Sequence, residues 1–381
     1  MDREGAEASW GVEFGHGRCS VRQRASPAGG TGRRFRRLSG TLLILFVSAG
    51  LAAACADVGT ADRPSGEVVL YTSIPDPVVD RLQGVVERRF PDLDGDYWVP
   101  IRGEAITLRV VRGRTGDIQR LIEDEVESGG IKADVIWLAE PSPYETYKDM
   151  GLLAPYQAPS GAPSRSTYID PDGFYVAGRI ISMVIAWNTD LQPDGFTDWP
   201  DLHKVGLTAF PGPESGAARA TIQALLDKYG PSYFEILTSS GGVSVPSNGA
   251  ARDGLAARRY EAVAVLDYMV RQAKDSGLPL DYTYPAGGTV LIPSPLAITA
   301  DAQNPDAAKA FVDFILSQPG QEIVVEIGSF YPVRSDVDPP AGAPALNTID
   351  ALSVNWEALA LNQDAIRAFW EECWESPGGA G

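Results

Sequence analysis

Cysteine and histidine are both scarce in this chain of 381 residues, which contains three cysteines and two histidines. Cys19 and Cys55 lie within or at the end of an N-terminal leader, so a chain cleaved there keeps Cys373 alone. We therefore expect a mature protein without an intramolecular disulfide, stabilised by packing. His203 is the one histidine after residue 55, which argues against a Ser-His-Asp hydrolase and against a multi-histidine metal site.

Basic residues are also under-represented. Residues 1–55 hold eight of the 32 basic and four of the 50 acidic residues, which leaves 24 and 46 and a formal net charge of −22. A surface this acidic argues against nucleic acid or an anionic membrane as a partner. Dipoles within a cleft still permit a small anionic ligand. The sequence has no G-x-S-x-G, H-E-x-x-H, P-loop or G-x-G-x-x-G motif, and we expect no cofactor.

One long hydrophobic run is present, and a cysteine follows it. Residues 38–54 are apolar or small, four arginines lie between residues 33 and 37, and Cys55 comes directly after the run. The run is too short to span a membrane comfortably, so we predict an export signal. Residues 51–55 resemble the lipobox of bacterial lipoproteins, with Ala52 where leucine is usual, which predicts lipidation at Cys55. An ordinary secretory signal with a chance cysteine is the alternative.

The organisation around this leader follows from its composition. The residues before Arg33 include Asp2 and Glu4, which do not fit a positively charged signal region, so we expect the true start nearer Arg22 or beyond. Residues 1–55 are thus the predicted signal peptide, exported by the general or the twin-arginine route. Residues 56–66 are small and polar, as suits a tether, and the rest of the protein is expected outside the cytoplasm, anchored by lipid to the outer face of the membrane.

Strand and helix patterns alternate over the remaining chain. Apolar runs typical of buried strands occur at residues 68–71, 133–139 and 262–266. Segments with apolar residues at helical spacing alternate with such runs, as at residues 305–317. We predict an α/β fold with mainly parallel sheets and helices on both faces. A mature chain of about 326 residues exceeds what one hydrophobic core usually supports, so two lobes are expected.

Candidate binding residues lie where predicted strands end. In open α/β sheets, ligands collect at the carboxyl ends of strands, where helix N-termini present unpaired N–H groups. Hydroxyls and backbone N–H groups there suit an oxyanion, and Arg114 or Arg179 could add a bidentate contact. The predicted ligand-binding residues are Thr72, Ser73, Arg114, Thr115, Gly116, Glu140, Arg179, Ser215, Gly216, Asn248, Gly249, Asp267 and Tyr268.

Several stretches also resemble a known family. They include VVLYTS (68–73), VVRGRTGDI (110–118), ADVIWLAEPSPYETYKDMGLLAPY (133–156), GLTAFPGPESGAA (206–218) and NPDAAKAFVDFILSQPGQEIV (304–324). These segments are similar to the extracellular solute-binding proteins of ABC importers, in the branch of ferric-ion, phosphonate, sugar-phosphate and polyamine binders.

The resemblance implies a fold and a function. It implies a two-lobed, type II periplasmic-binding-protein-like architecture with a hinge, in which residues 67–165 and 293–381 form one lobe and residues 166–292 the other. A solute held between the lobes would be delivered to an ABC permease and its ATPase by a monomeric protein that is not an enzyme. Ligand contacts to both lobes exist only when the lobes close, so binding selects the closed form.

The ligand class stays open. Ferric binders of this family commonly use two adjacent tyrosines after the strand that corresponds to residues 262–266, whereas this chain has Asp267 and Tyr268, with Glu140 as a further oxygen donor. A phosphonate or phosphate ester is our leading expectation. A polyamine (against Trp137, Tyr144 and Glu140), a sugar and an amino acid are alternatives. From other classes, a secreted enzyme with paired carboxylates and a sensor lobe for a membrane kinase also remain.

Overall fold

The computed structural model describes residues 9–11, 22–24, 66–87, 106–157 and 168–375. The predicted cleavage zone, the lipidation site Cys55 and the tether lie outside these described residues. Within them, no helix combines the length and the apolar character needed to cross a membrane.

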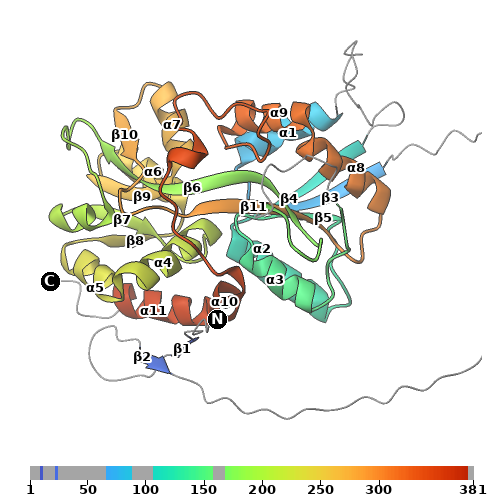
Figure 1. The fold of residues 1–381 in the computed structure, drawn as a ribbon, viewed down its shortest axis with the longest axis horizontal. Coiled ribbons are helices and arrows are strands. Elements are labelled where there is room, and N and C mark those ends of the chain that lie inside the picture. The colour runs from blue at the N-terminus through green and yellow to red at the C-terminus, as the bar shows by residue number, and fades with distance from the viewer. Residues whose placement is uncertain (1–8, 12–21, 25–65, 88–105, 158–167, 376–381) are drawn as a thin grey trace, which may run out of the picture.

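A single nine-stranded sheet runs through the molecule (Figure 1). Its order is β4–β3–β5–β11–β6–β9–β7–β8, and β10 pairs with β6. The strands are β3 (Gly66–Thr72), β4 (Ile106–Arg112), β5 (Val135–Trp137), β6 (Val176–Asn188), β7 (Thr208–Pro211), β8 (Val243–Val245), β9 (Ala262–Leu266), β10 (Leu280–Thr283) and β11 (Leu291–Ile298). Two short strands near the N-terminus, β1 (Ser9–Gly11) and β2 (Arg22–Arg24), form a separate antiparallel pair.

The sheet is parallel at both ends and antiparallel in the middle. β3 is parallel to β4 and β5, and β7 is parallel to β8 and β9. β11 is antiparallel to β5 and β6, and β6 is antiparallel to β9 and β10. The prediction of mainly parallel sheets therefore holds for the two ends, while the return of the chain through β6 and β11 makes the middle antiparallel.

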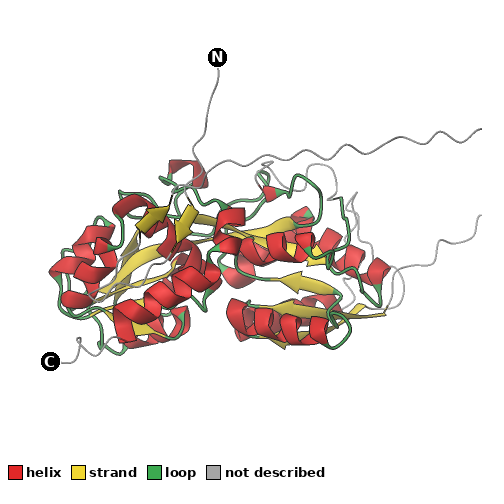
Figure 2. Cartoon of the chain, turned by 90° about the horizontal axis from the view of Figure 1, so that it is seen from below, coloured by secondary structure: helices red, strands yellow, loops and turns green. Residues whose placement is uncertain are grey.

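β6 belongs to both lobes, which explains its unbroken apolar sequence. Residues 176–182 pair with β11, and residues 183–187 pair with β9. Every residue of β6 is buried. Figure 2 shows helices beside the strands of each lobe, and such cover suits a central strand with a continuous apolar run. The molecule is thus a two-lobed α/β protein in which β6 and β11 connect the lobes.

Helices flank the sheet on each side of this connection. On the β4–β3–β5 side, the first lobe, lie α1 (Asp76–Glu87), α2 (Thr115–Glu127), α3 (Ser142–Asp149), α8 (Pro305–Leu316) and α9 (Gln318–Gly328). On the β9–β7–β8 side, the second lobe, lie α4 (Gly216–Tyr229), α5 (Ser232–Ser239), α6 (Asn248–Ala256), α7 (Asp267–Asp275) and the 3₁₀ helix η2 (Trp199–Lys204). The 3₁₀ turn η3 (Leu346–Thr348), α10 (Trp356–Leu361) and α11 (Gln363–Glu375) end the described chain.

The last helix does not lie where the sequence led us to expect it. We expected residues 293–381 to return to the first lobe as a unit, but α11 packs on α4 and α5 of the second lobe. Trp370 contacts Phe210 and Phe234, each with ring centroids 5.7 Å apart, so an aromatic cluster holds the helix there. Cys373 is disulfide-bonded in this chain. Both other cysteines, Cys19 and Cys55, lie outside the described residues, so the expectation of a mature protein without an intramolecular disulfide stays a prediction.

Candidate ligand-binding site

A cavity of about 620 Å³ lies between the lobes. The first lobe lines it with the start of α1 and the turn between β4 and α2. The second lobe lines it with the first residues of α4, α6 and α7, and β6 contributes Arg179 and Ile181. Residues of both lobes therefore surround the same space.

Four helix N-termini converge on this cavity. Thr115 begins α2, Ser215 precedes α4, Asn248 begins α6 and Tyr268 is the second residue of α7, and all four line the cavity. Ser247 also caps α6, because its Oγ accepts a hydrogen bond of 3.1 Å from the amide of Ala250. The first amides of a helix lack intrahelical acceptors and carry a partial positive charge, so this geometry favours an anion.

Arg179 forms part of the cavity wall, and no carboxylate in the described part of the chain pairs with it. Its side chain is 2 % exposed, Nε donates to Ser294 Oγ at 3.1 Å, and Nη1 is buried without a hydrogen-bond partner among the described residues. The guanidinium lies 4.1 Å from the centre of the Phe330 ring and 5.7 Å from that of Trp137. Burial lowers the pKa of Arg179 to about 10, because the charged form is desolvated without a counter-ion.

Further polar atoms on the cavity wall are also unpaired. Ser73 Oγ, Thr115 Oγ1 and Asn248 Oδ1 are buried and have no hydrogen-bond partner in the described structure. Asn248 Nδ2 donates to Ser215 Oγ at 2.7 Å, which orders these two side chains. Buried polar groups are almost always hydrogen-bonded, so these atoms can accept or donate hydrogen bonds to a polar molecule in the cavity.

Most of the predicted residues meet at this cavity. Those on its wall are Ser73, Arg114, Thr115, Arg179, Ser215, Asn248, Gly249 and Tyr268. Thr72 lies behind the wall, where its Oγ1 donates to the Trp137 carbonyl at 2.8 Å and accepts from the amide of Ile74. Thr72 therefore shapes the turn that presents Ser73.

Gly116 and Gly216 lie where the lobes touch and do not line the cavity. The Gly116 amide donates to the carbonyl of Glu214, on the other lobe, at 3.1 Å. A Cβ atom on Gly216 would come within 2.8 Å of Glu140 Cγ and 2.9 Å of Thr115 Oγ1. Both glycines therefore allow the backbones of α2 and α4 to approach closely.

The predicted carboxylates have other partners. Glu140 Oε1 accepts from Arg219 Nη2 at 2.6 Å, and both side chains are almost fully buried. Asp267 Oδ2 accepts from Arg271 at 3.0 Å and from the Tyr284 hydroxyl at 2.8 Å. Neither carboxylate lines the cavity, since each is held by an arginine beside it.

The three residues named for a ferric ion do not all lie on the cavity wall. The described residues contain no group of three or more His, Cys, Asp or Glu side chains that could hold a metal ion. Tyr268 does line the cavity, but burial raises the pKa of its hydroxyl to about 12 although Arg179 acts to lower it. A hard trivalent cation needs several anionic oxygens, which Glu140, Asp267 and Tyr268 do not provide together.

Some cavity residues escaped the sequence analysis. Arg112, the last residue of β4, and Arg252, one turn into α6, both line the cavity. Arg112 pairs with Asp76 at 3.1 Å and Arg252 with Asp253 at 2.7 Å, so each is partly neutralised. The sequence did offer a signal for Arg252. It lies four residues after Asn248 on one helix, and residues at this spacing share a helix face.

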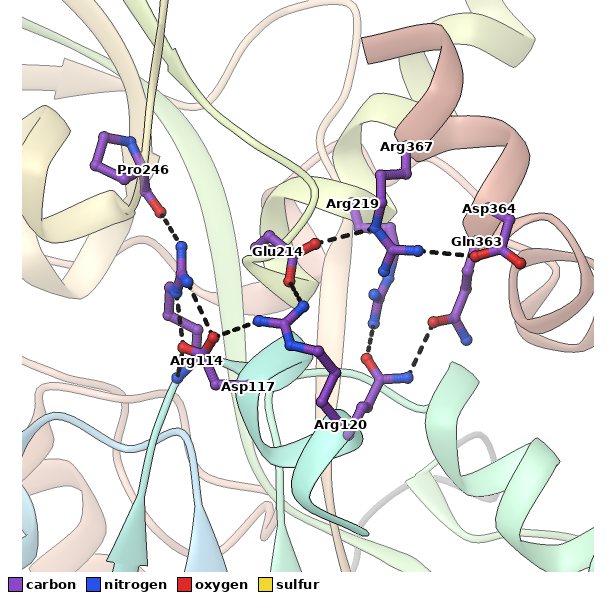
Figure 3. Close-up of polar contacts among 10 residues, drawn as sticks. Arg114, Asp117, Arg120, Glu214, Arg219, Pro246, Gln363, Asp364 and Arg367 are labelled. Carbon is purple, nitrogen blue, oxygen red and sulfur yellow. Dashed lines mark hydrogen bonds and ion pairs between the residues drawn. The ribbon is translucent and has the colours of Figure 1, made fainter. Parts of the chain in front are cut away.

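The lobes also contact each other beside the cavity (Figure 3). Arg120 of α2 pairs with Glu214 at 2.8 Å, and Arg219 donates to Gln119 Oε1 at 2.9 Å. Arg114 Nη1 donates to the Pro246 carbonyl at 3.2 Å. These contacts join α2 of the first lobe to Glu214, to α4 and to the β8–α6 turn of the second, so the lobes are closed onto each other along this side of the cavity.

A family model described as "Bacterial extracellular solute-binding protein" matches residues 102–328, which is more than half of the chain. The chain belongs to this family. The expected resemblance is thus confirmed at the level of the family and the fold. A comparison with curated proteins found no match.

Solved structures of similar fold come from several solute binders. One is the periplasmic binding protein AfuA from Actinobacillus pleuropneumoniae with fructose-6-phosphate bound, at 20 % identity, TM-score 0.70, and coverage of 81 % of this chain and 99 % of that one. Another is iron-bound HitA from Pseudomonas aeruginosa, at 19 % identity, TM-score 0.66, and coverage of 79 % and 98 %. A third is the Trichodesmium protein IdiA (FutA) with iron and citrate, at 17 % identity, TM-score 0.62, and coverage of 81 % and 99 %. At these identities the likeness shows the fold.

Proposed function

We propose that this solute-binding protein captures a small organic anion, such as a phosphonate or phosphate ester, between its lobes and delivers it to an ABC permease and its ATPase. Arg179 carries the proposal. A buried guanidinium without a counter-ion is unfavourable, and an anionic ligand in the adjoining cavity would neutralise it. An oxyanion would also accept from the Ser73 and Thr115 hydroxyls and from the amides at the helix N-termini.

The remaining wall favours an organic ligand over an inorganic ion. Ile181, Leu266, Met269 and Ile327 add apolar surface to the cavity. A volume of about 620 Å³ is that of a site for a small organic molecule. The fructose-6-phosphate bound to AfuA is a ligand of this chemistry, while the iron in HitA represents the alternative that the same fold accommodates.

The proposal also covers the division of the chain into lobes, the closing motion and the membrane anchor. We propose residues 67–165 and the chain from 293 to α10 as the first lobe, and residues 166–292 with α11 as the second. Closure would then be a population shift, since an anion in contact with Thr115 and Ser215 bridges the lobes only in the closed form. Export, lipidation at Cys55 and a monomeric state belong to the same proposal, and the protein would release its ligand unchanged.

A thermal-shift screen tests the ligand class. The purified chain is melted with phosphonates, phosphate esters, ferric citrate, polyamines, sugars and amino acids in turn. A ligand at a hundredfold excess over its dissociation constant should add about 2.7 kcal/mol of stability, and we expect this only for the organic phosphates or phosphonates. Mass spectrometry of the released ligand should show it unchanged.

The Arg179→Met variant is the negative control for this screen, because it removes the unpaired cation but keeps an apolar side chain of similar length. It should lose the response to the anion. A shift with ferric citrate or a polyamine alone, or an Arg179→Met variant that still responds to the anion, would overturn the proposal.

A further inference from the structure

The C-terminal helices connect the two lobes on their own. α10 packs on α3 of the first lobe, and α11 packs on α4 and α5 of the second (Figure 1). Asn362 is the one residue between Leu361, which ends α10, and Gln363, which begins α11. A rotation that separates α3 from α4 must therefore bend the chain at this residue or detach one of the two helices.

Polar contacts reinforce this connection (Figure 3). Gln119 of α2 donates to Gln363 Oε1 at 2.9 Å, which joins the first lobe to the start of α11. One turn later, Arg367 donates to Glu214 at 3.0 Å. Glu214 also accepts from Arg120 at 2.8 Å, so a single carboxylate receives one arginine from the first lobe and one from α11.

The charge state of Glu214 fits this role. Burial acts to raise its pKa, but the hydrogen bonds from Arg120 and Arg367 outweigh burial and lower it, so the carboxylate stays ionised at neutral pH. A carboxylate shared by two arginines forms a small network, which is more effective than an isolated surface ion pair.

We propose that residues 355–375 form a strap that restrains opening of the cleft by tying α11 to α2 through Gln363 and through Arg367 and Glu214. The strap holds the closed form without help from a ligand, so this proposal does not depend on the ligand class. Opening requires release of the Gln119–Gln363 and Arg120–Glu214 contacts, while the aromatic packing of Trp370 keeps α11 on the second lobe.

The Gly116 amide reports opening directly. It is the second residue of α2, where a helical N–H has no acceptor within its own helix, and it donates to the Glu214 carbonyl across the lobes. Its hydrogen exchange therefore rises when the lobes separate, without unfolding of α2. Amides of β9, in the centre of the second lobe, provide the internal reference for global unfolding.

Hydrogen exchange of the purified chain without added solute tests the strap. The measured quantity is the ratio of the exchange rate at Gly116 to that of the β9 amides, because a loss of global stability raises the β9 rate and cannot by itself raise this ratio. Gln363→Ala removes a hydrogen bond between the lobes, and Arg367→Met removes one of the two arginines that hold Glu214 opposite Arg120. In both variants we expect this ratio to rise by up to about tenfold. Glu371→Gln is the control, because Glu371 is an exposed carboxylate on α11 for which the described structure shows no ion pair.

The exchange ratios of these variants either support or overturn the strap. A raised ratio in both α11 variants, with the wild-type ratio in Glu371→Gln, supports the strap. An unchanged ratio in both, together with a raised ratio in Arg120→Met, would show that the α2–Glu214 contact works without the C-terminal helices and would overturn it. The screen of the preceding section can fail without changing either result.

Discussion

Arg219 Nη2 lies 2.6 Å from Glu140 Oε1, and the two side chains come from opposite lobes. Both are 1 % exposed or less, and Arg219 Nε and Nη1 have no partner among the described residues. The closed form therefore contains a buried, incompletely satisfied charge pair beside the ligand cavity. Because opening would return both charges to water, this pair links the stability of the closed form to the position of the hinge.

Glu140→Gln should shift the protein towards the open form. Leaving Arg219 buried without its carboxylate would cost about 3–5 kcal/mol, and opening avoids that cost by hydrating the guanidinium. Small-angle scattering of the variant should give a larger radius of gyration than the wild type. The double variant Glu140→Leu with Arg219→Met removes both charges and should restore the compact form. A wild-type radius in Glu140→Gln would show that the pair does not favour closure.

Gly216→Ala should also oppose closure, for a steric reason. The added methyl would lie 2.8 Å from Glu140 Cγ on the other lobe, and overpacking of this kind costs about 1–3 kcal/mol. We expect weaker binding, by about tenfold or more, of the anion that gives the largest shift in the wild type, measured by calorimetry. Gly206→Ala is the control, since a Cβ atom on Gly206 would have no neighbouring atom within 4 Å. Equal affinities in the two variants would contradict this account.

Arg179→Met should stabilise the protein while no solute is bound. Removing a buried cation that lacks a counter-ion should raise the free energy of unfolding by about 1–3 kcal/mol, measured by urea denaturation. Arg252→Met changes a partly exposed, paired arginine and should stay within about 0.5 kcal/mol of the wild type. A less stable Arg179→Met would indicate that the contacts with Trp137 and Phe330 outweigh the charge.

The strand-end rule predicted much of the site, because it depends on local order alone. Ser73, Thr115, Ser215 and Asn248 each follow a strand and precede or begin a helix, and the fold brings them to one cavity. Glu140 satisfied the same rule, yet Arg219 pairs with it from 79 residues away. No local pattern shows such a distant partner.

The helices show the same limit. The resemblance implied that residues 293–381, and with them Trp370, belong to the first lobe. Phe210 and Phe234, the partners of Trp370, lie in the second lobe, at a distance along the chain that periodicity does not address. The partner of Asp267 could have been predicted from local sequence. Arg271 follows Asp267 by one helical turn and pairs with it at 3.0 Å.

His203 should make stability depend on pH. The residue lies in the 3₁₀ helix η2, where Nε2 is buried without a partner among the described residues and the ring centre is 4.7 Å from that of Tyr233. Burial lowers its pKa below the ordinary value of 6.5, although a backbone hydrogen bond at Tyr233 acts in the opposite direction. The unfolded chain therefore binds a proton at a higher pH than the folded one, so stability falls as the pH drops through 6.5.

His203→Phe keeps an aromatic ring against Tyr233 and removes the titrating group. The melting temperature of the wild type should fall between about pH 7.5 and pH 5.5 more steeply than that of the variant, because only the wild type gains a proton on unfolding there. His203→Gln is the second variant, since it also cannot titrate but loses the ring contact. It should be less stable than the wild type at neutral pH and share the shallow slope. Parallel slopes in all three proteins would show that the imidazole titrates alike in the folded and unfolded chains.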